Sequence, residues 1–328
     1  MRLRKLSGWF LVLAVVVSGA AAMADNFGTG LNVFTIDFVP ISGATNPTSG
    51  IPAGDGFSFT GVTNDHRMGK FEITNDQWDK FKANLAPVPV TGNPLTAYDT
   101  APSYAGLNVP TNNVSWYEAA QFVNWLNTST GHQAGYNFIG TQGTSDYTLT
   151  TWSPAEAAGG TNLYRHKDAF YYLPTENEWM KAAYWNGTAL QDYATKAGES
   201  LTQGNGTSGS GWNYYTTTTH YATNPPGPWN VGCGSEELNG THDMMGNVGE
   251  WMESSFGGTY DASSSRGLRG GYWGNSYGAL LSWTRDNVIP LHEAIGLGFR
   301  VASVPEPGSM ILLVSRAIVA LILWRRCK

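Results

Sequence analysis

Helix-start signals occur at three places in this chain, and they limit what it can fold into. Ser115 is followed three residues later by Glu118, and Thr175 by Glu178, each just before an apolar run with helical spacing. This Ser/Thr-x-x-Glu pattern is a capping box, which satisfies free backbone N–H groups at the start of a helix. Thr74 precedes a third apolar run with helical spacing. The sequence therefore predicts three helices, one after each cap.

The rest of the chain favours loops and short strands. It has 328 residues with 40 glycines, 13 tryptophans and 16 tyrosines, and only 13% of its residues are charged. Such aromatic content excludes a disordered chain. Residues 33–39 and 68–73 are predicted strands, and the Gly- and Thr-rich residues 187–230 are predicted to be a surface insertion or a lid. We expect one α+β domain with little regular secondary structure.

The N-terminus is typical of a secretory signal peptide. A basic start with Arg2, Arg4 and Lys5 precedes a short apolar run at residues 9–17, and Ala-Met-Ala at 22–24 is a small-x-small cleavage site. The apolar run is too short for a stable membrane span. We therefore expect residues 1–24 to be removed and the exported domain to begin at Asp25.

The C-terminus carries a second targeting pattern at residues 304–328. Pro-Glu-Pro at 305–307 precedes a mostly apolar run, and a basic end closes the chain. This resembles the PEP-CTERM sorting signal of Gram-negative bacteria, although Arg316 interrupts the apolar run. The resemblance implies an exosortase partner, transient membrane contact, removal of the tail and delivery to the envelope or extracellular matrix. The alternative is a plain C-terminal anchor.

Charge and cysteine content exclude other classes. The formal net charge is −6, which argues against a nucleic-acid partner. The chain has two cysteines, Cys233 and Cys327. Because Cys327 lies beyond the apolar tail, Cys233 has no partner in the exported domain, and no structural disulfide is expected there.

Six sequence blocks occur in an order that is similar to one family. They are GKFEITN at 69–75, PTNNVSWYEAA with NWLN at 110–127, LPTENEW with KAA at 173–183, DMMGNVGEW at 243–251, LRGGYW at 268–273 and GFRV at 298–301. Together they resemble the formylglycine-generating enzyme, or sulfatase-modifying factor, family, and the blocks begin at about residue 68. The resemblance implies a single compact fold related to C-type lectins, spanning residues 25–303.

Enzymes of that family oxidise a sulfatase cysteine with molecular oxygen and copper held by two cysteines. The corresponding stretch here is residues 271–281, where Asn275 stands at about the first position and Ala279 or Leu280 at the second. None of these side chains can ligate Cu(I), which prefers soft thiolates. We therefore expect the oxidase activity and the copper site to be lost, with no catalytic residue in their place. The alternative is an active oxidase with relocated ligands.

A related branch uses non-haem iron with a His-x-x-x-His-x-Glu spacing. No two histidines of this chain are four residues apart, so we expect none to be an iron ligand. The six are His66, His132, His166, His220, His242 and His292.

The resemblance also implies a calcium site. In the family, one such site takes oxygens from the block that corresponds to residues 243–250. Carried over, Asp243 and Glu250 supply side-chain oxygens, while Gly246 and Val248 supply backbone carbonyls. Ca²⁺ prefers six to eight oxygens from such a mixture. The alternative is a solvated turn and a capping pair without an ion.

Aromatic and arginine residues near the end of the domain complete the candidate set. Trp273, Tyr277 and Trp283 are predicted either to line a groove for sugar or peptide, or to pack in the core. In a chain with so few charges, we expect the arginines to pair with buried carboxylates rather than to act in catalysis; these are Arg269, Arg285 and Arg300. The expected function is an exported binding or structural module of the envelope or matrix.

Overall fold

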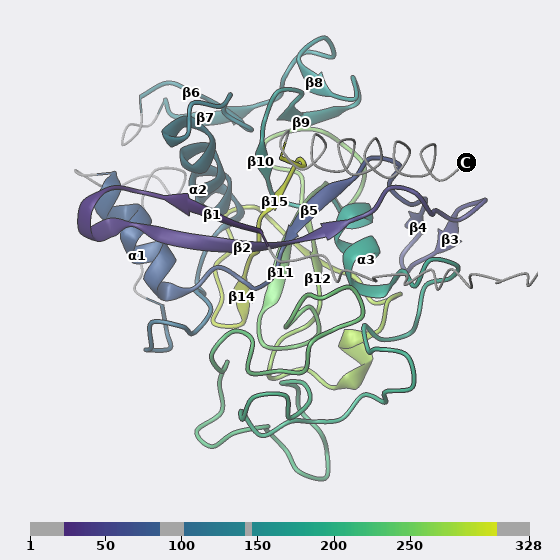
Figure 1. Ribbon diagram of the computed structural model, residues 1–328. Coiled ribbons are helices and arrows are strands. Elements are labelled where there is room, and N and C mark those ends of the chain that lie inside the picture. The colour runs from purple at the N-terminus through teal and green to yellow at the C-terminus, as the bar shows by residue number, and fades with distance from the viewer. Residues whose placement is uncertain (1–22, 86–101, 142–145, 307–328) are drawn as a thin grey trace, which may run out of the picture.

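The computed structural model describes residues 23–85, 102–141 and 146–306 (Figure 1). Most of the predicted signal peptide and most of the predicted sorting tail lie outside these residues. Within them, the three predicted helices are confirmed as α1 (Asn75–Asn84), α2 (Trp116–Ser129) and α3 (Glu176–Tyr184). No helix of the described part is long and apolar enough to cross a membrane.

Each helix begins at the predicted cap. The Ser115 side chain accepts a hydrogen bond from the Glu118 backbone N–H, and the Glu118 side chain accepts one from the Ser115 N–H. Thr175 and Glu178 form the same reciprocal pair. Thr74 also forms a capping box, with the amide of Gln77 in place of a carboxylate. Local sequence therefore decides where all three helices start.

Two sheets form the centre of the domain. The larger has the strand order β1-β2-β5-β15-β10, and every neighbouring pair in it is antiparallel. Its strands are β1 (Met23–Phe27), β2 (Phe34–Ile41), β5 (His66–Gly69), β10 (Tyr171–Tyr172) and β15 (Ala302–Ser303). The strands from the two ends of the domain thus meet in one sheet.

The second sheet has the order β13-β12-β11-β14. Its strands are β11 (Gly249–Ser255), β12 (Arg266–Arg269), β13 (Asp286–Val288) and β14 (Leu297–Gly298). β11 pairs antiparallel with β12 and parallel with β14. Three of the six family blocks end in this sheet or next to it, so its strands position the candidate site.

Shorter elements complete the described part. The two-stranded hairpins are β3 (Ile51–Pro52) with β4 (Ser58–Phe59), β6 (Asn137–Ile139) with β7 (Thr148–Thr150), and β8 (Ala157–Ala158) with β9 (Asn162–His166). Two 3-10 helices are η1 (Gly30–Asn32) and η2 (Tyr277–Leu280). The predicted strand at 33–39 is confirmed as β2. The predicted strand at 68–73 is wrong after Gly69, because the chain leaves the sheet there to reach the cap of α1.

The core has two parts. Aromatic rings of α1 and α2 pack with one another and with Phe299, which follows β14: Phe122 lies 4.9 Å from Phe81, 5.4 Å from Phe299 and 5.7 Å from Trp78 between ring centroids. A second cluster surrounds α3, whose Trp179 is fully buried. In Figure 1, α1 and α2 lie toward one end of the β1–β2 hairpin and α3 toward the other.

Residues 187–230 agree with the prediction in part. They form no helix or named strand, as expected, and their loops lie at the lower edge in Figure 1. They are nevertheless not a detached lid, because Trp212 and Asn213 are each only 2% exposed. The amide of Asn213 donates a hydrogen bond to the Gly227 carbonyl and another to the side chain of Asn247. The segment is therefore part of the folded core on one side.

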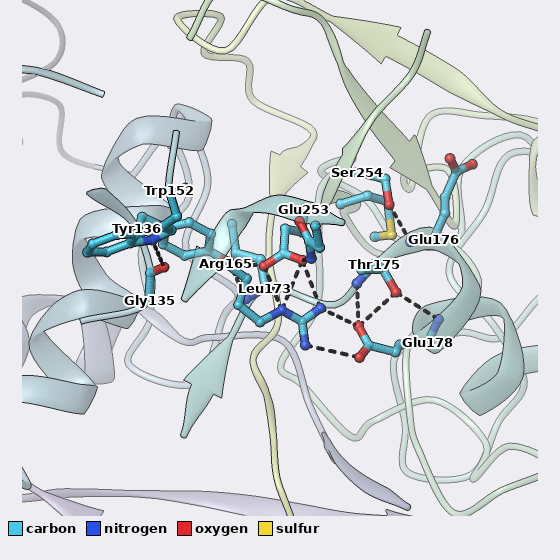
Figure 2. A network of polar contacts seen from close by, with 12 residues as sticks. Gly135, Tyr136, Trp152, Arg165, Leu173, Thr175, Glu176, Glu178, Glu253 and Ser254 are labelled. Atoms are coloured by element: carbon cyan, nitrogen blue, oxygen red, sulfur yellow. Dashed lines mark hydrogen bonds and ion pairs between the residues drawn. The ribbon is translucent and has the colours of Figure 1, made fainter. Parts of the chain in front are cut away.

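A buried charge network joins α3 to the two sheets (Figure 2). Arg165 of β9 donates to both carboxylate oxygens of Glu178 at 3.1 and 2.9 Å, and to Glu253 of β11 at 2.7 to 3.0 Å. Its guanidinium also lies 3.6 Å from the ring centroid of Tyr172. Burial alone would raise the pKa of Glu178, but the Arg165 contacts outweigh burial and lower it to about 2. Glu178 therefore caps the start of α3 and also carries a negative charge that Arg165 stabilises.

The two ends of the described domain meet at one buried arginine. Arg67 forms a two-pronged contact with the Asp25 carboxylate, at 3.0 and 2.6 Å, and lies 3.7 Å from Glu306. Asp25 is the residue that the predicted cleavage would make N-terminal. Although β1 begins two residues earlier, at Met23, cleavage before Asp25 would keep this contact.

Replacing Arg165 with methionine tests the charge network. Arg165→Met leaves Glu178 and Glu253 buried without their cation, so we expect the free energy of unfolding to fall by about 3–5 kcal/mol. Urea denaturation of the full chain measures the change. The matched control is Lys80→Met, which breaks the more exposed Lys80–Asp76 pair and should cost less than about 1 kcal/mol. Equal losses in the two variants would contradict the assignment.

Candidate functional site

The stretch that corresponds to the family's copper site is a tight turn followed by η2. The Asn275 side-chain oxygen accepts a hydrogen bond from the Tyr272 N–H at 3.0 Å, and its N–H donates to the Tyr272 carbonyl at 2.8 Å. Its own carbonyl accepts from the Tyr215 N–H at 2.7 Å. Asn275 therefore closes the turn and ties it to the loop of residues 187–230.

The structure separates the two candidates for the second cysteine position. Leu280 is fully buried in the α3 cluster, and its carbonyl accepts a hydrogen bond from the Tyr184 hydroxyl at 2.9 Å. Ala279 instead lines a cavity together with Asn275. A Cβ on Gly271 would stand 3.0 Å from the Ala279 Cβ and 3.3 Å from the Asn275 Oδ1. Asn275 and Ala279 thus face the same small space, which Gly271 leaves open.

This cavity has a volume of about 360 Å³, which is within the range of small-ligand sites. Its wall includes Leu268 of β12, the two glycines that follow this strand, Ala294 and Leu297. Two exposed residues, Ile295 and His292, also line it. We call it the η2 cavity. Its lining is largely apolar but also includes charged groups.

Two of those charged groups are arginines that share one carboxylate. Arg269 donates to Glu176 Oε1 at 2.8 Å, while Arg285 donates to both Glu176 oxygens at 2.7 Å. Glu176 is fully buried at the first turn of α3, where the helix dipole favours a negative charge. Arg285 also stacks at 3.9 Å on the ring of Phe256. The arginine prediction is confirmed for both, and their remaining donors bind backbone carbonyls.

One residue of the predicted calcium segment, Glu250, pairs with the third arginine, Arg300. Glu250 of β11 accepts three hydrogen bonds from Arg300, at 2.9, 2.7 and 2.6 Å, and one from the Trp179 indole N–H at 2.7 Å. Both its oxygens are therefore in use, and this third arginine prediction is also confirmed. A calcium ion bound here would have to displace Arg300 from Glu250. As arranged, the Glu250 carboxylate does not fit the role of an ion ligand.

The remaining members of that segment are buried. Asp243 is 2% exposed and accepts a hydrogen bond from the Gly232 N–H at 2.6 Å. Burial raises its pKa to about 6 against the opposing effects of that bond and of Arg300. Gly246 has a φ of +83°, and a Cβ there would stand 2.1 Å from the Asn213 carbonyl oxygen. The calcium site at Asp243, Gly246, Val248 and Glu250 stays a prediction.

A carboxylate that the sequence reading missed lies beside this segment. Glu72 is 1% exposed and accepts hydrogen bonds from the Asn247 amide at 2.7 Å and the Val248 N–H at 3.0 Å. Burial raises its pKa well above the ordinary value, with Asp243 and Glu250 adding to the rise. The available signal was its place in the GKFEITN block, where a single Glu stands between apolar residues. In the described part, no group of three or more His, Cys, Asp or Glu is arranged to hold a metal ion.

The three aromatic candidates have different surroundings. Trp273 is 8% exposed and packs with Tyr104 at 5.9 Å and Tyr221 at 5.5 Å between ring centroids. Tyr277 is 60% exposed and lines a second cavity, and Trp283 is 47% exposed. A groove shared by all three stays a prediction. Trp273 packs as a core residue does, whereas Tyr277 has a free ring face.

Comparison with known proteins agrees with this architecture. The family model for the sulfatase-modifying factor enzyme 1-like domain matches residues 58–304. The chain belongs to this family. The expected α+β fold, with three helices and many short strands, is thereby confirmed. No functionally curated protein matches this sulfatase-modifying-factor chain significantly.

Solved structures show the same fold. CarF is 23% identical with a TM-score of 0.57, and it covers 83% of this chain and 99% of its own. Treponema denticola variable protein 1 is 21% identical with a TM-score of 0.54, covering 86% and 99%. PvdO from Pseudomonas aeruginosa is 16% identical with a TM-score of 0.51, covering 86% and 98%. At these identities the likeness of the sulfatase-modifying-factor domain to them establishes the fold alone.

Restoring cysteines tests whether the η2 cavity is the remnant of a copper site. Because Asn275 and Ala279 face one space, the Asn275→Cys/Ala279→Cys variant should bind about one Cu(I) per chain through its thiolates. The unchanged chain should bind none there. Competition with a colorimetric Cu(I) chelator measures both.

The matched control for this test is Asn275→Cys/Leu280→Cys. Leu280 lies in the core, so its replacement should place no second thiol in the cavity. Cu(I) binding by the unchanged chain, or equal binding by the two cysteine pairs, would contradict the placement.

Proposed function

We propose that this chain is an exported member of the sulfatase-modifying factor family without the oxidase activity, and that it binds a polypeptide segment of the envelope or matrix in the η2 cavity. The observation that carries the proposal is the open cavity at Asn275 and Ala279, where the family's thiolates are replaced but the space is kept. A purely structural descendant would be expected to fill such a space, since protein interiors are close-packed.

The rim of the cavity supports a polypeptide ligand. Ile289, Leu291 and Ile295 are 56%, 43% and 47% exposed on the segment that borders it. Exposed apolar residues that gather beside a cavity are typical of interaction sites. An apolar segment of another protein would cover them and remove their surface from water.

The sheet beside the cavity supports the same ligand class. β13 pairs with β12 on one side, and in the described part no strand pairs with its other edge. Two of its residues, Asp286 and Val288, line the cavity. An extended peptide can add to such an edge through main-chain hydrogen bonds while its side chains occupy the neighbouring pocket.

The proposed location comes from the ends of the chain. Residues 1–24 and 304–328 suit a signal peptide and a PEP-CTERM tail, with an exosortase as processing partner and transient membrane contact through the tail. The envelope or matrix is then the compartment in which the η2 cavity meets its ligand. Activity as an oxidase with relocated ligands is the competing function, and the copper measurement above separates the two.

Filling the cavity tests the binding proposal. Random heptapeptides displayed on phage should yield extended, apolar peptides that bind the purified full chain. Ala279→Phe places a ring in the cavity, and we expect it to weaken the selected peptides at least about tenfold by direct titration, as removal of a central contact does.

The control for the filled cavity is Ala197→Phe, which adds the same ring on an exposed loop outside the cavity. It should leave the affinity unchanged. Thermal melting of both variants checks that they fold. Failure to select any peptide, or peptides that bind Ala279→Phe as tightly as the unchanged chain, would contradict the proposal.

We also propose, as a separate prediction, that calcium binds at Asp243, Gly246, Val248 and Glu250 by displacing Arg300 from Glu250. A ligand that binds only the folded state raises the melting temperature, by an amount that grows with the ligand concentration over its Kd. Adding millimolar calcium to chelator-treated full chain should therefore raise the melting temperature, with magnesium as the control ion. An unchanged melting temperature would mean that Glu250 keeps Arg300 and that no ion binds.

A further inference from the structure

A second cavity adjoins the first residue of η2, Tyr277. It has a volume of about 480 Å³ and is lined by three tyrosines, Tyr193, Tyr214 and Tyr277, together with Glu199 and Thr195. We call it the tyrosine cavity. Tyr277, the first residue of η2, belongs to it, whereas Ala279 two residues later lines the η2 cavity. The two cavities are therefore separate spaces that share one short helix.

The tyrosine hydroxyls are available to a ligand. In the described residues, the phenol oxygens of Tyr193, Tyr214 and Tyr277 form no hydrogen bond with the protein, yet none of them is a fully enclosed atom. Burial raises the pKa of Tyr193, with Asp192 and Tyr277 adding to the rise, and burial together with Tyr193 raises the pKa of Tyr214. The three hydroxyls therefore lie close enough to influence one another.

The cavity walls are held in place by the backbone. The Gln191 amide donates to the carbonyls of Tyr193 and Thr195, and the Gln203 amide donates to the carbonyl of Tyr214. Ala194, between two wall residues, is fully buried. A site whose walls are fixed before binding avoids the entropic cost of ordering them.

The arrangement matches the chemistry of a sugar. One face of a pyranose ring presents C–H groups, which an aromatic ring such as the 60% exposed Tyr277 can cover. Sugar hydroxyls both donate and accept hydrogen bonds, as phenol hydroxyls do, and the Glu199 carboxylate accepts from hydroxyl pairs. Tyrosine offers a large, rigid contact area at low entropic cost.

We propose that the tyrosine cavity is a carbohydrate-binding site that takes a neutral oligosaccharide, with Tyr277 stacked on a sugar ring and Glu199 accepting from its hydroxyls. A neutral sugar is favoured over an acidic one, because Glu199 lines the cavity and the chain carries a net charge of −6.

The test uses the purified full chain and a set of soluble oligosaccharides of glucose, mannose, galactose and N-acetylglucosamine. We expect at least one of them to bind in a calorimetric titration. Tyr277→Ala should weaken that binding at least about tenfold, as loss of an aromatic anchor does. Tyr193→Phe, which removes one hydroxyl and keeps the ring, should weaken it by about threefold to tenfold.

Two matched controls separate this site from others. Tyr260→Ala removes a 37% exposed tyrosine outside the cavity and should leave sugar binding unchanged. Ala279→Phe fills the η2 cavity and should also leave sugar binding unchanged. The experiment therefore distinguishes a failure of this proposal from a failure of the proposed peptide site. The proposal is overturned if no oligosaccharide binds the folded chain, or if Tyr277→Ala and Tyr260→Ala bind equally well.

Discussion

The buried pair of Glu250 and Arg300 holds the centre of this domain together. Arg300 donates to Glu250 of β11, and also to the carbonyls of Gly69 and His242. Glu250 in turn accepts from Trp179 of α3. Four of the six family blocks therefore meet around a single charge pair. Because a buried charge without its partner costs several kcal/mol, these blocks have to come together for the chain to fold.

The same requirement explains why the fold does not depend on the residues at positions 275 and 279. The groups that hold the blocks together are buried carboxylates, arginines and helix caps, none of which is Asn275 or Ala279. At those positions Asn275 closes a turn and Ala279 leaves open space. The blocks around the η2 cavity are thus held together by contacts outside these two positions.

η2 and its flanking turn connect the two candidate surfaces. Asn275 and Ala279 face the cavity beside β13, while Tyr277 faces the tyrosine cavity. The loop of residues 187–230 supplies the other walls of the tyrosine cavity, and the Tyr215–Asn275 backbone hydrogen bond ties that loop to the turn. The turn and η2 therefore lie between the two cavities, which remain separate spaces.

Local interactions decided what could be predicted from the sequence. Caps act within three residues, so the starts of α1, α2 and α3 were readable from Thr74, Ser115 and Thr175, and the scarcity of charge indicated that the arginines are paired. Tertiary structure decided the rest. Whether residue 279 or 280 faces the cavity depends on how η2 packs on α3. That Glu250 is paired with Arg300, and that Tyr193 and Tyr214 join Tyr277, depends on contacts between residues 50 or more positions apart in the sequence. Sequence spacing carries no information about such contacts, because they form only when the whole core closes.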